Sequence, residues 1–183
     1  MITIRKARKE DSEFIARGFL TAMWISEAEQ RKLLPTCIHL AEMYDSLYSW
    51  RNAHIALFDG TKAGVLISYD GAIYKEAAAK TFEFIRKEGG EDFTQMTQEA
   101  VAGEWYLDTL SVVPKFRRQG IATMLLKYGI ELCKHNPTTN TITLYVDPSH
   151  DWVVDLYSRI GFKSCGEAFI FGQNYKKMEV VTD

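Results

Sequence analysis

Apolar residues recur with two different periods along the chain, and the period at each point predicts a strand or a helix. Where every second residue is apolar and β-branched or aromatic side chains are frequent, the pattern favours a half-buried strand. The segments with strand character are 2–7, 54–58, 62–69, 104–113, 141–146, 162–170 and 175–181. The turn pair Asp59-Gly60 joins the second and third of them and predicts a β-hairpin.

Spacings of three and four between apolar residues predict amphipathic helices elsewhere. The first begins near Asp11, a residue type that commonly caps a helix N-terminus. The second spans 24–50 and is expected to break at Pro35. Three further helical faces lie within 74–85, 121–132 and 152–160. Glycines follow the first and the last of these three, as is common just past a helix C-terminus.

The composition is that of a globular protein and narrows the classes of function. At 183 residues, 46% of them hydrophobic, the chain is long enough for one domain with a buried core. A formal net charge of −2 argues against an extended nucleic-acid surface, which requires an excess of positive charge. Cys37, Cys133 and Cys165 are scattered, which favours reduced thiols in a cytoplasmic protein. The chain shows neither a membrane-spanning apolar run nor a signal-peptide pattern.

The segment 108–122 carries the clearest chemistry. A strand ends at Pro114, which has no N–H to donate to a sheet, and a helix opens after Gly120. The first backbone N–H groups of a helix are unpaired and carry the positive end of its dipole. Glycine lets a ligand approach this backbone, and Arg117 and Arg118 add positive charge. We therefore expect a phosphate or pyrophosphate to bind here.

Two motifs resemble those of the GCN5-related N-acetyltransferase (GNAT) superfamily. The first is Leu110-Ser-Val-Val-Pro114 followed by Arg117, Gly120 and Ala122, and the second is Leu156-Tyr157-x-x-x-Gly161-Phe162. The resemblance covers nearly the whole chain outside the segment 71–103. It implies an α/β fold of the GNAT (acyl-CoA N-acyltransferase) type, with a mixed, mostly antiparallel seven-stranded sheet flanked by helices.

The same resemblance implies acetyl-CoA as cosubstrate and supplies a set of cofactor-binding residues. These are Leu110, Ser111, Val112, Arg117, Arg118, Gln119, Gly120, Ile121, Ala122, His150 and Tyr157. In the family the tyrosine of the second motif lies near the thioester sulfur and often acts as general acid, so Tyr157 is expected to protonate the departing thiolate. The alternative is that Tyr157 only packs in the core. Direct attack by an amine requires no metal.

The general base is less sharply defined. Glu104, Tyr106 and Asp108 alternate on one strand and are expected on one face of the sheet. The family commonly carries a glutamate base on this face. Asp108 is preferred over Glu104, and either carboxylate could instead bind the acceptor amine. His150 stands where the family often has asparagine, and it could contact the cofactor, relay a proton or face water.

The segment 71–103 is an insertion relative to the short turn that many GNAT domains have at this point. Long connections inside compact domains tend to be functional or mobile. Because the insertion leads into Glu104, it is expected to be a lid or a specificity element on the acceptor side, with a plain decoration as the alternative. Four aromatic residues are expected either to line the acceptor pocket or to belong to the core: Trp24, Tyr44, Tyr48 and Trp50.

These observations predict a single domain over 1–183 that moves an acetyl group from acetyl-CoA to a primary amine. The acceptor stays open between a small molecule (polyamine, amino sugar, antibiotic or amino acid) and a protein N-terminus or lysine, with acidic residues favouring a cationic small molecule. No nucleic-acid or membrane partner is expected, and a homodimer is compatible with the sequence. The second hypothesis is a non-catalytic acyl-CoA sensor or interaction module. A nucleotide-triphosphate site is disfavoured because no Gly-Lys-Ser/Thr follows the glycine loop.

Overall fold

The structure, a computed structural model, describes residues 1–93, 96–170 and 172–182. These residues form a seven-stranded sheet in the order β1-β2-β3-β4-β5-β7-β6. The strands are β1 (Ile2–Lys6), β2 (Ala53–Phe58), β3 (Thr61–Asp70), β4 (Glu104–Val112), β5 (Thr141–Val146), β6 (Lys163–Ile170) and β7 (Gln173–Val181). Neighbouring strands are antiparallel except for β4 and β5, which are parallel. The mixed, mostly antiparallel sheet predicted from the sequence is confirmed.

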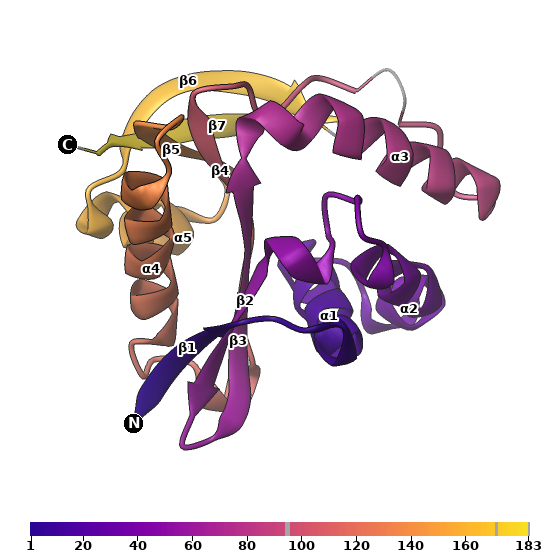
Figure 1. Ribbon diagram of the computed structural model, residues 1–183, viewed down its shortest axis with the longest axis horizontal. Helices are drawn as coiled ribbons and strands as arrows, with labels where there is room; N and C mark the ends of the chain where they lie inside the picture. The colour runs from indigo at the N-terminus through magenta and orange to yellow at the C-terminus, as the bar shows by residue number, and fades with distance from the viewer. Residues whose placement is uncertain (94–95, 171, 183) are drawn as a thin grey trace.

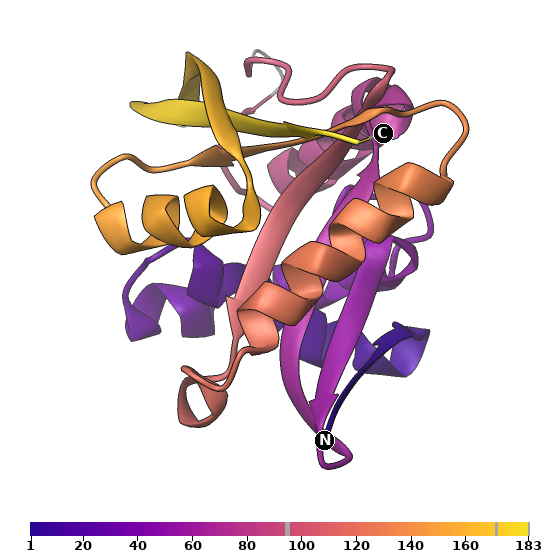
Figure 2. The ribbon, with the colours of Figure 1, turned by 90° about the vertical axis from the view of Figure 1, so that its left-hand side faces the viewer.

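Helices cover both faces of this sheet (Figure 1). Within the described residues the α-helices are α1 (Ser12–Ala22), α2 (Glu27–Glu42), α3 (Tyr74–Lys87), α4 (Ile121–His135) and α5 (Asp151–Ile160). Helices α1, α2 and α3 lie on one side of the sheet, and α4 and α5 lie on the other. Helix α4 crosses the strands diagonally, as the view in Figure 2 shows.

The central strand β3 separates two hydrophobic clusters. Its residues Val65, Ile67 and Tyr69 pack on the side of α1, whereas Leu66 packs on the side of α4. A strand covered on both faces needs apolar residues at consecutive positions. The run from Ala63 to Tyr69 is accordingly buried throughout.

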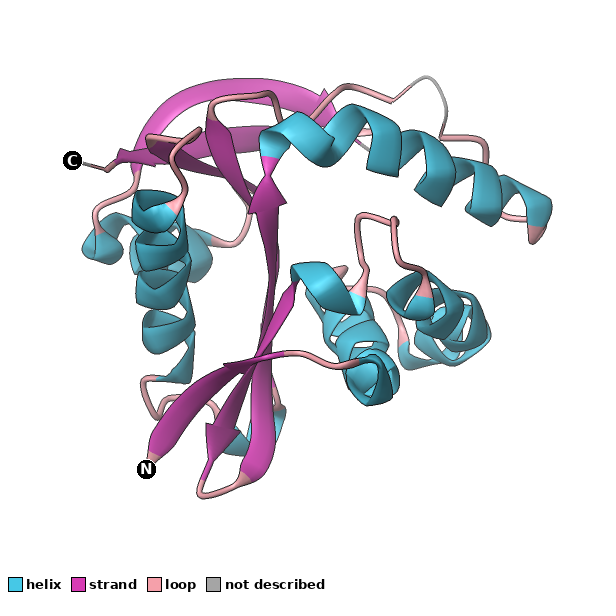
Figure 3. Cartoon of the chain, in the orientation of Figure 1, coloured by secondary structure: helices cyan, strands magenta, loops and turns pink. Residues whose placement is uncertain are grey.

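The insertion 71–103 connects β3 to β4 and comprises α3 and an extended segment (Figure 3). The N–H of Gly90 donates to the carbonyl of Ile85 at 2.9 Å and helps to close the end of α3, where the sequence has its glycine pair. Several polar contacts attach the insertion to other parts of the fold, and three of them reach the loop after α2 and the end of β6. Leu47 N–H donates to Thr81 Oγ1 at 2.9 Å, Lys80 pairs with Asp45 at 2.6 Å, and Thr97 Oγ1 donates to the carbonyl of Phe169 at 3.0 Å. The insertion therefore bridges the loop after α2 and the β6–β7 hairpin.

Asp11 occupies the N-cap position of α1, as expected, but its side chain makes no capping hydrogen bond there. Its carboxylate instead accepts hydrogen bonds from the Arg5 guanidinium at 2.7 Å and from the Arg8 N–H at 2.9 Å, and pairs with Lys62 at 2.6 Å. The hydrogen bond from Arg5 is the main cause that holds the pKa of this buried carboxyl well below its ordinary value. Asp11 thus ties β1, β3 and the start of α1 together.

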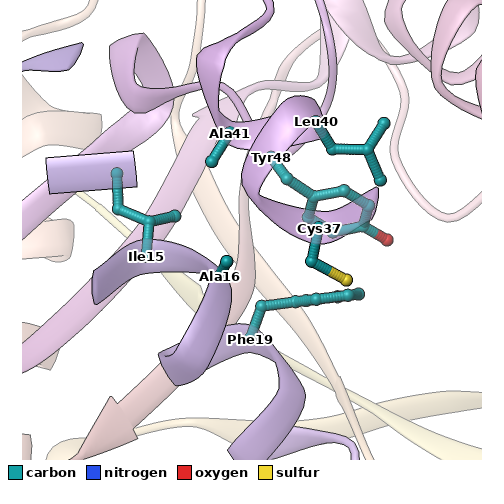
Figure 4. A pocket seen from close by; sticks show the side chains of 7 residues that line it. All are labelled: Ile15, Ala16, Phe19, Cys37, Leu40, Ala41 and Tyr48. Carbon is teal, nitrogen blue, oxygen red and sulfur yellow. The ribbon is translucent and has the colours of Figure 1, made fainter. Parts of the chain in front are cut away.

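The expected helix break at Pro35 is wrong, because α2 continues through Pro35 to Glu42. Proline removes one intrahelical hydrogen bond, so another contribution must keep the helix continuous. The turn after Pro35 packs against α1, where the lining residues are Ile15, Ala16, Phe19, Cys37, Leu40, Ala41 and Tyr48 (Figure 4). These side chains leave no room for a water molecule between the helices. Burial of this apolar surface offsets the missing hydrogen bond.

Candidate functional site

The basic loop between β4 and α4 leaves a row of backbone donors free. Arg118 and Gly120 both adopt positive φ, at 62° and 81°, and Gly120 is the N-cap of α4. This left-handed conformation is the one that glycine adopts without steric cost. Within the described part of the chain, the backbone N–H groups of 118–123 have no hydrogen-bond acceptor. Residues 117–120 are exposed, so the loop can present these donors and its arginines to an anion.

Strands β4 and β5 separate before either strand ends. Their pairing runs only from Glu104 opposite Thr141 to Leu107 opposite Leu144, while β4 remains paired with β3 as far as Val112. The two strands diverge in Figure 2. Among the described residues, the backbone of 108–112 therefore has no partner on the β5 side. This free edge includes the predicted cofactor residues Leu110, Ser111 and Val112.

A cleft of about 200 Å³ lies on the α1 side of the same end of β4. It is lined by Phe14, Arg17, Gly18 and Thr21 of α1, Gly64 and Val65 of β3, and residues 111–114. The free strand edge, the cleft and the basic loop are thus contiguous along the chain from Ser111 to Gly120.

A β-bulge at Asp108 changes which residues of β4 face α1. Ser68 pairs with Leu107 and Ile67 pairs with Thr109, so Asp108 is the extra residue on β4. Before the bulge, the apolar side chains on the α4 side come from odd-numbered positions, Trp105 and Leu107. After the bulge they come from even-numbered positions, Leu110 and Val112. The alternation of the two faces along β4 therefore changes phase at Asp108. The shared face expected for Glu104, Tyr106 and Asp108 is nevertheless present.

Asp108 carries a basic carboxylate in a largely desolvated position. Tyr69 Oη donates to its Oδ2 at 2.8 Å, and Thr109 Oγ1 donates to its Oδ1 at 2.9 Å. Desolvation, followed by the neighbouring charge of Glu99, raises the pKa of Asp108 to about 7 despite these two donors. The group can therefore gain or lose a proton near neutral pH.

Glu99 of the insertion lies close to the Asp108 carboxylate and is held by two tyrosines. Tyr106 Oη donates to its Oε2 at 2.6 Å, and Tyr74 Oη donates to its Oε1 at 3.2 Å. Burial raises the pKa of Glu99, and the two hydroxyl donors oppose that increase. The rings of Tyr69 and Tyr106 lie 5.7 Å apart, so the two tyrosine–carboxylate pairs are neighbours.

Glu104, the other predicted base, is engaged in a different interaction. Lys177 Nζ lies 2.7 Å from its Oε1, and Thr143 Oγ1 donates to its Oε2 at 3.2 Å. Glu104 thus already has a protein cation as its partner, whereas no described lysine, arginine or histidine pairs with Asp108. The geometry therefore favours Asp108 over Glu104.

Comparison with known proteins agrees with this architecture. The sequence profile of the Acetyltransferase (GNAT) family matches residues 24–162, most of the chain. The chain belongs to this family. A stretch of 58 residues is 33% identical to N-alpha-acetyltransferase 50 of Danio rerio, and this stretch covers 32% of the chain and 34% of that relative. The match thus spans about a third of the curated relative's length.

Solved structures of acetyltransferases share the whole fold. One crystal structure of an acetyltransferase is 27% identical with a TM-score of 0.75, and the alignment covers 99% of this chain and 100% of that one. An N-acetyltransferase from Staphylococcus aureus Mu50 is 23% identical with a TM-score of 0.77, covering 97% and 100%. A PaiA N-acetyltransferase from Thermoplasma acidophilum in complex with coenzyme A is 18% identical with a TM-score of 0.64, covering 99% of both chains. At identities this low the last two show the fold alone.

The tyrosine of the second GNAT motif lies on α5, on the other side of the sheet from α1. The ring of Tyr157 packs edge-on against Phe162 with 5.7 Å between centroids, as expected if Gly161 turns the chain back on the helix. Burial raises the pKa of Tyr157 to about 12. The phenol therefore keeps its proton at neutral pH, which is a requirement for a general acid.

His150 begins α5 and makes its main contact with the loop after α1. Its ring stacks on Trp24 with 4.4 Å between centroids, and its Nδ1 lies 3.4 Å from Asp147 Oδ2. Trp152 adds an edge contact to Trp24 at 5.9 Å. Trp24 adopts a φ of 56°, which is uncommon for a bulky residue and is maintained by its surroundings. A role of His150 at the cofactor stays a prediction.

The predicted pocket aromatics divide into two groups. Tyr48 is buried against Phe19, and Asp108 and Glu99 contribute to raising its pKa, so it lies near the acidic residues. Tyr44 is 65% exposed and stacks under Arg51 instead, so it does not line this site. Sequence reasoning did not single out Tyr69 or Glu99 as site residues. Tyr69 ends a buried strand and Glu99 lies in a polar stretch, and neither position carries a motif.

Other chemistries find no support in the described residues. There, no group of three His, Cys, Asp or Glu side chains could hold a metal ion, and no helix is long and apolar enough to cross a membrane. Cys37 and Cys133 are buried free thiols, and Cys165 is an exposed one. Burial raises the pKa of the Cys37 thiol to about 11, which keeps it protonated and unreactive.

Proposed function

We propose that this protein transfers the acetyl group of acetyl-CoA to a primary amine, and that Asp108 is the general base. The observation that carries the proposal is the position of Asp108. It is the bulged residue at the point where β4 leaves β5, and its pKa of about 7 suits proton transfer at neutral pH. An amine is protonated at that pH and must lose a proton before it can attack a thioester.

The residues of this site can account for each proton in the reaction. Asp108 accepts one proton from the ammonium of the acceptor, and Tyr69 keeps its carboxylate oriented through the 2.8 Å hydrogen bond. The neutral nitrogen bonds to the acetyl carbon, and free N–H groups of 108–112 stabilise the negative charge on the carbonyl oxygen. The C–S bond then breaks, Tyr157 gives its proton to the sulfur, and the excess proton on nitrogen leaves to solvent. Asp108 releases its proton to solvent, and Tyr157 regains a proton from water.

The basic loop is assigned to the cosubstrate. Its unpaired N–H groups at 118–123 and the open space around Gly120, where an added Cβ would meet no atom within 4 Å, suit a bulky anion such as the pyrophosphate of acetyl-CoA. Arg117 is positioned by its own hydrogen bond to the carbonyl of Val112 at 3.2 Å.

The insertion is assigned to the acceptor side. It brings Tyr74 and Glu99 next to β4 and contacts β6 through Thr97. Covering the acidic residues from solvent in this way favours a cationic small molecule over a folded protein as acceptor. We assign the insertion as a lid within a single domain that comprises the whole chain.

The matched variants Asp108→Asn and Glu104→Gln test the assignment of the base. Thiol release from acetyl-CoA would be followed with a panel of amines between pH 6 and pH 9. Loss of a general base typically costs about 10²–10⁴-fold in rate, so Asp108→Asn should lower kcat/KM by this amount. The wild-type rate should rise with pH through about 7, where Asp108 loses its proton, and Glu104→Gln should keep this profile.

Two outcomes would contradict the proposal. Wild-type activity in Asp108→Asn would remove Asp108 as the base. Binding of acetyl-CoA by calorimetry without thiol release for any amine would support the acyl-CoA sensor instead.

A further inference from the structure

We propose that Glu99 of the insertion is part of the acceptor-binding site: its negative charge binds the incoming ammonium of the acceptor and acts electrostatically on the Asp108 carboxylate, which takes the proton. The insertion would then complete the catalytic site rather than only cover it. This inference rests on the proposed function and adds a role for a residue that no motif marks.

The first step of the argument is the arrangement of the two carboxylates. Each one has a dedicated tyrosine donor, Tyr69 for Asp108 at 2.8 Å and Tyr106 for Glu99 at 2.6 Å. These two tyrosines are directly opposite each other on β3 and β4. The two hydrogen-bonded pairs are therefore neighbours on one face of the sheet, with 5.7 Å between the tyrosine rings, although Glu99 comes from a different segment of the chain.

The second step is the absence of a protein cation beside these carboxylates. Among the described residues, no lysine, arginine or histidine forms an ion pair with Asp108 or Glu99, whereas Glu104 on the same face has Lys177 at 2.7 Å. Two like charges in a desolvated site repel each other unless a cation joins them. A protonated amine supplies that charge, and it gives its proton to the carboxylate that is the stronger base.

The third step assigns separate roles to the two groups. Glu99 accepts two phenolic hydroxyls, from Tyr74 and Tyr106, and phenolic donors favour the ionised form of a carboxylate. Asp108 is the group with the pKa of about 7, and the charge of Glu99 is one of the causes. Glu99 is thus suited to remain negative while Asp108 takes the proton.

Other ionisable groups surround the pair without supplying a cation. The groups that interact electrostatically with Glu99 are Asp108 and Tyr106 of β4, Tyr69 of β3, Tyr74 of α3, Tyr48 of the loop before β2, Tyr145 of β5 and Tyr175 of β7. All these tyrosines have raised pKa values and are neutral at pH 7. Within this set, the groups that can carry a charge at neutral pH are therefore the carboxylates of Glu99 and Asp108.

The test is a ¹³C NMR titration of the aspartate and glutamate side-chain carboxyls, in wild type and in Glu99→Gln. Removing the charge of Glu99 should lower the pKa of Asp108 by about one unit. In the same variant, the acid limb of the kcat/KM profile should move by the same amount toward lower pH. The KM for the amine should rise at least about tenfold, because an ionic contact is lost. Glu91→Gln removes an exposed carboxylate from the same insertion and should change none of these quantities.

Each outcome of this test decides the inference. An Asp108 titration that is the same in wild type and folded Glu99→Gln overturns it, since a purely structural Glu99 would alter stability but not this pKa. If Glu99→Gln does not fold, the wild-type titration is sufficient. If the two carboxyls are coupled, the ¹³C resonances of Asp108 and Glu99 should each show a two-step titration. Two independent single-step titrations would overturn the inference. The NMR readout does not need turnover, so failure of the acetyl-transfer proposal would be seen separately, as absence of thiol release.

Discussion

The two ends of β4, proposed to bind the cofactor and the acceptor, differ in structure. At the proposed cofactor end, the loop before α4 presents the unpaired backbone N–H groups of 118–123 together with the exposed residues Arg117 and Arg118. At the acceptor end, carboxylates and tyrosines from separate segments of the chain meet in a desolvated layer. The groups of the first arrangement are close in sequence and exposed to solvent. Those of the second come from separate segments, are brought together by the fold and are largely desolvated.

This contrast predicts different consequences for substitutions at the two ends. An exposed donor competes with water, so its loss alters binding modestly and depends on salt. A buried charge is sensitive to every neighbour, so a change at the acceptor end should alter rates, pH profiles and stability together. The following substitutions test whether the two ends are separable in this way.

Tyr157→Phe tests the proposed proton donor and should have the largest effect. The variant removes only the hydroxyl, so the ring packing against Phe162 and the stability should change little. Loss of the proton donor should lower kcat by about 10²–10⁴-fold. The affinity for CoA, measured by calorimetry, should stay near the wild-type value, because the donor acts in the transition state. Tyr128→Phe, on α4, removes a hydroxyl outside the site and is the control. Full activity in Tyr157→Phe would leave water as the proton source.

Gly120→Asp and Gly120→Asn together isolate charge at the cofactor end. Both side chains tolerate the left-handed conformation that Gly120 adopts, so they share the backbone cost. Only aspartate places a negative charge near the expected pyrophosphate. We expect Gly120→Asp to bind acetyl-CoA about ten- to a hundredfold more weakly than Gly120→Asn at low salt, with a smaller difference at high salt. Equal affinities in calorimetry would mean that the phosphates bind elsewhere.

The same contrast explains which parts could be predicted from the sequence. Strand and helix periods predicted the individual elements, and the local string from Leu110 to Ala122 predicted the loop, because both depend on neighbouring residues. The arrangement of the strands in one mixed sheet was implied by the resemblance to the GNAT superfamily. The group of carboxylates and tyrosines around Asp108 and Glu99 was not predicted, because Glu99 contacts Tyr106 only when α3 and the extended segment have folded over the sheet. A local sequence pattern contains no information on such a long-range contact.

The errors also have physical causes. The apolar residues Trp105 and Leu107 are out of phase with Leu110 and Val112, and this change of phase at Asp108 marks the bulge that a strict alternation overlooks. Pro35 did not end a helix because packing on α1 outweighed its local preference. The Asp11 carboxylate pairs with Arg5 and Lys62 from two different strands instead of capping α1 with its side chain. A rule about helix caps does not include such distant partners.

The smallest expected effect is a gain in stability from Asp108→Asn, which would sharpen the contrast between the ends. The folded-state pKa of about 7 lies above the ordinary value of 3.8, so the folded protein holds a proton that the unfolded chain has lost. Wild-type stability should therefore fall as pH rises from about 4 to about 7 and stay lower above that range. The difference between the two pKa values corresponds to at most about 4 kcal/mol.

Asparagine has no such penalty and can still accept a hydrogen bond from Tyr69. We expect Asp108→Asn to melt about 5 °C higher than wild type at pH 8, with little difference at pH 4, by calorimetric or circular-dichroism melting. Asp59→Asn, an exposed carboxylate in the β2–β3 turn, should show no comparable gain at pH 8. A desolvated carboxylate that lowers the free energy of unfolding is typical of a functional site, where activity is maintained at the expense of stability. If the difference in melting temperature between Asp108→Asn and wild type were the same at pH 8 and at pH 4, the Asp108 carboxyl would be solvated. The proposed acceptor end would then be as accessible to water as the proposed cofactor end.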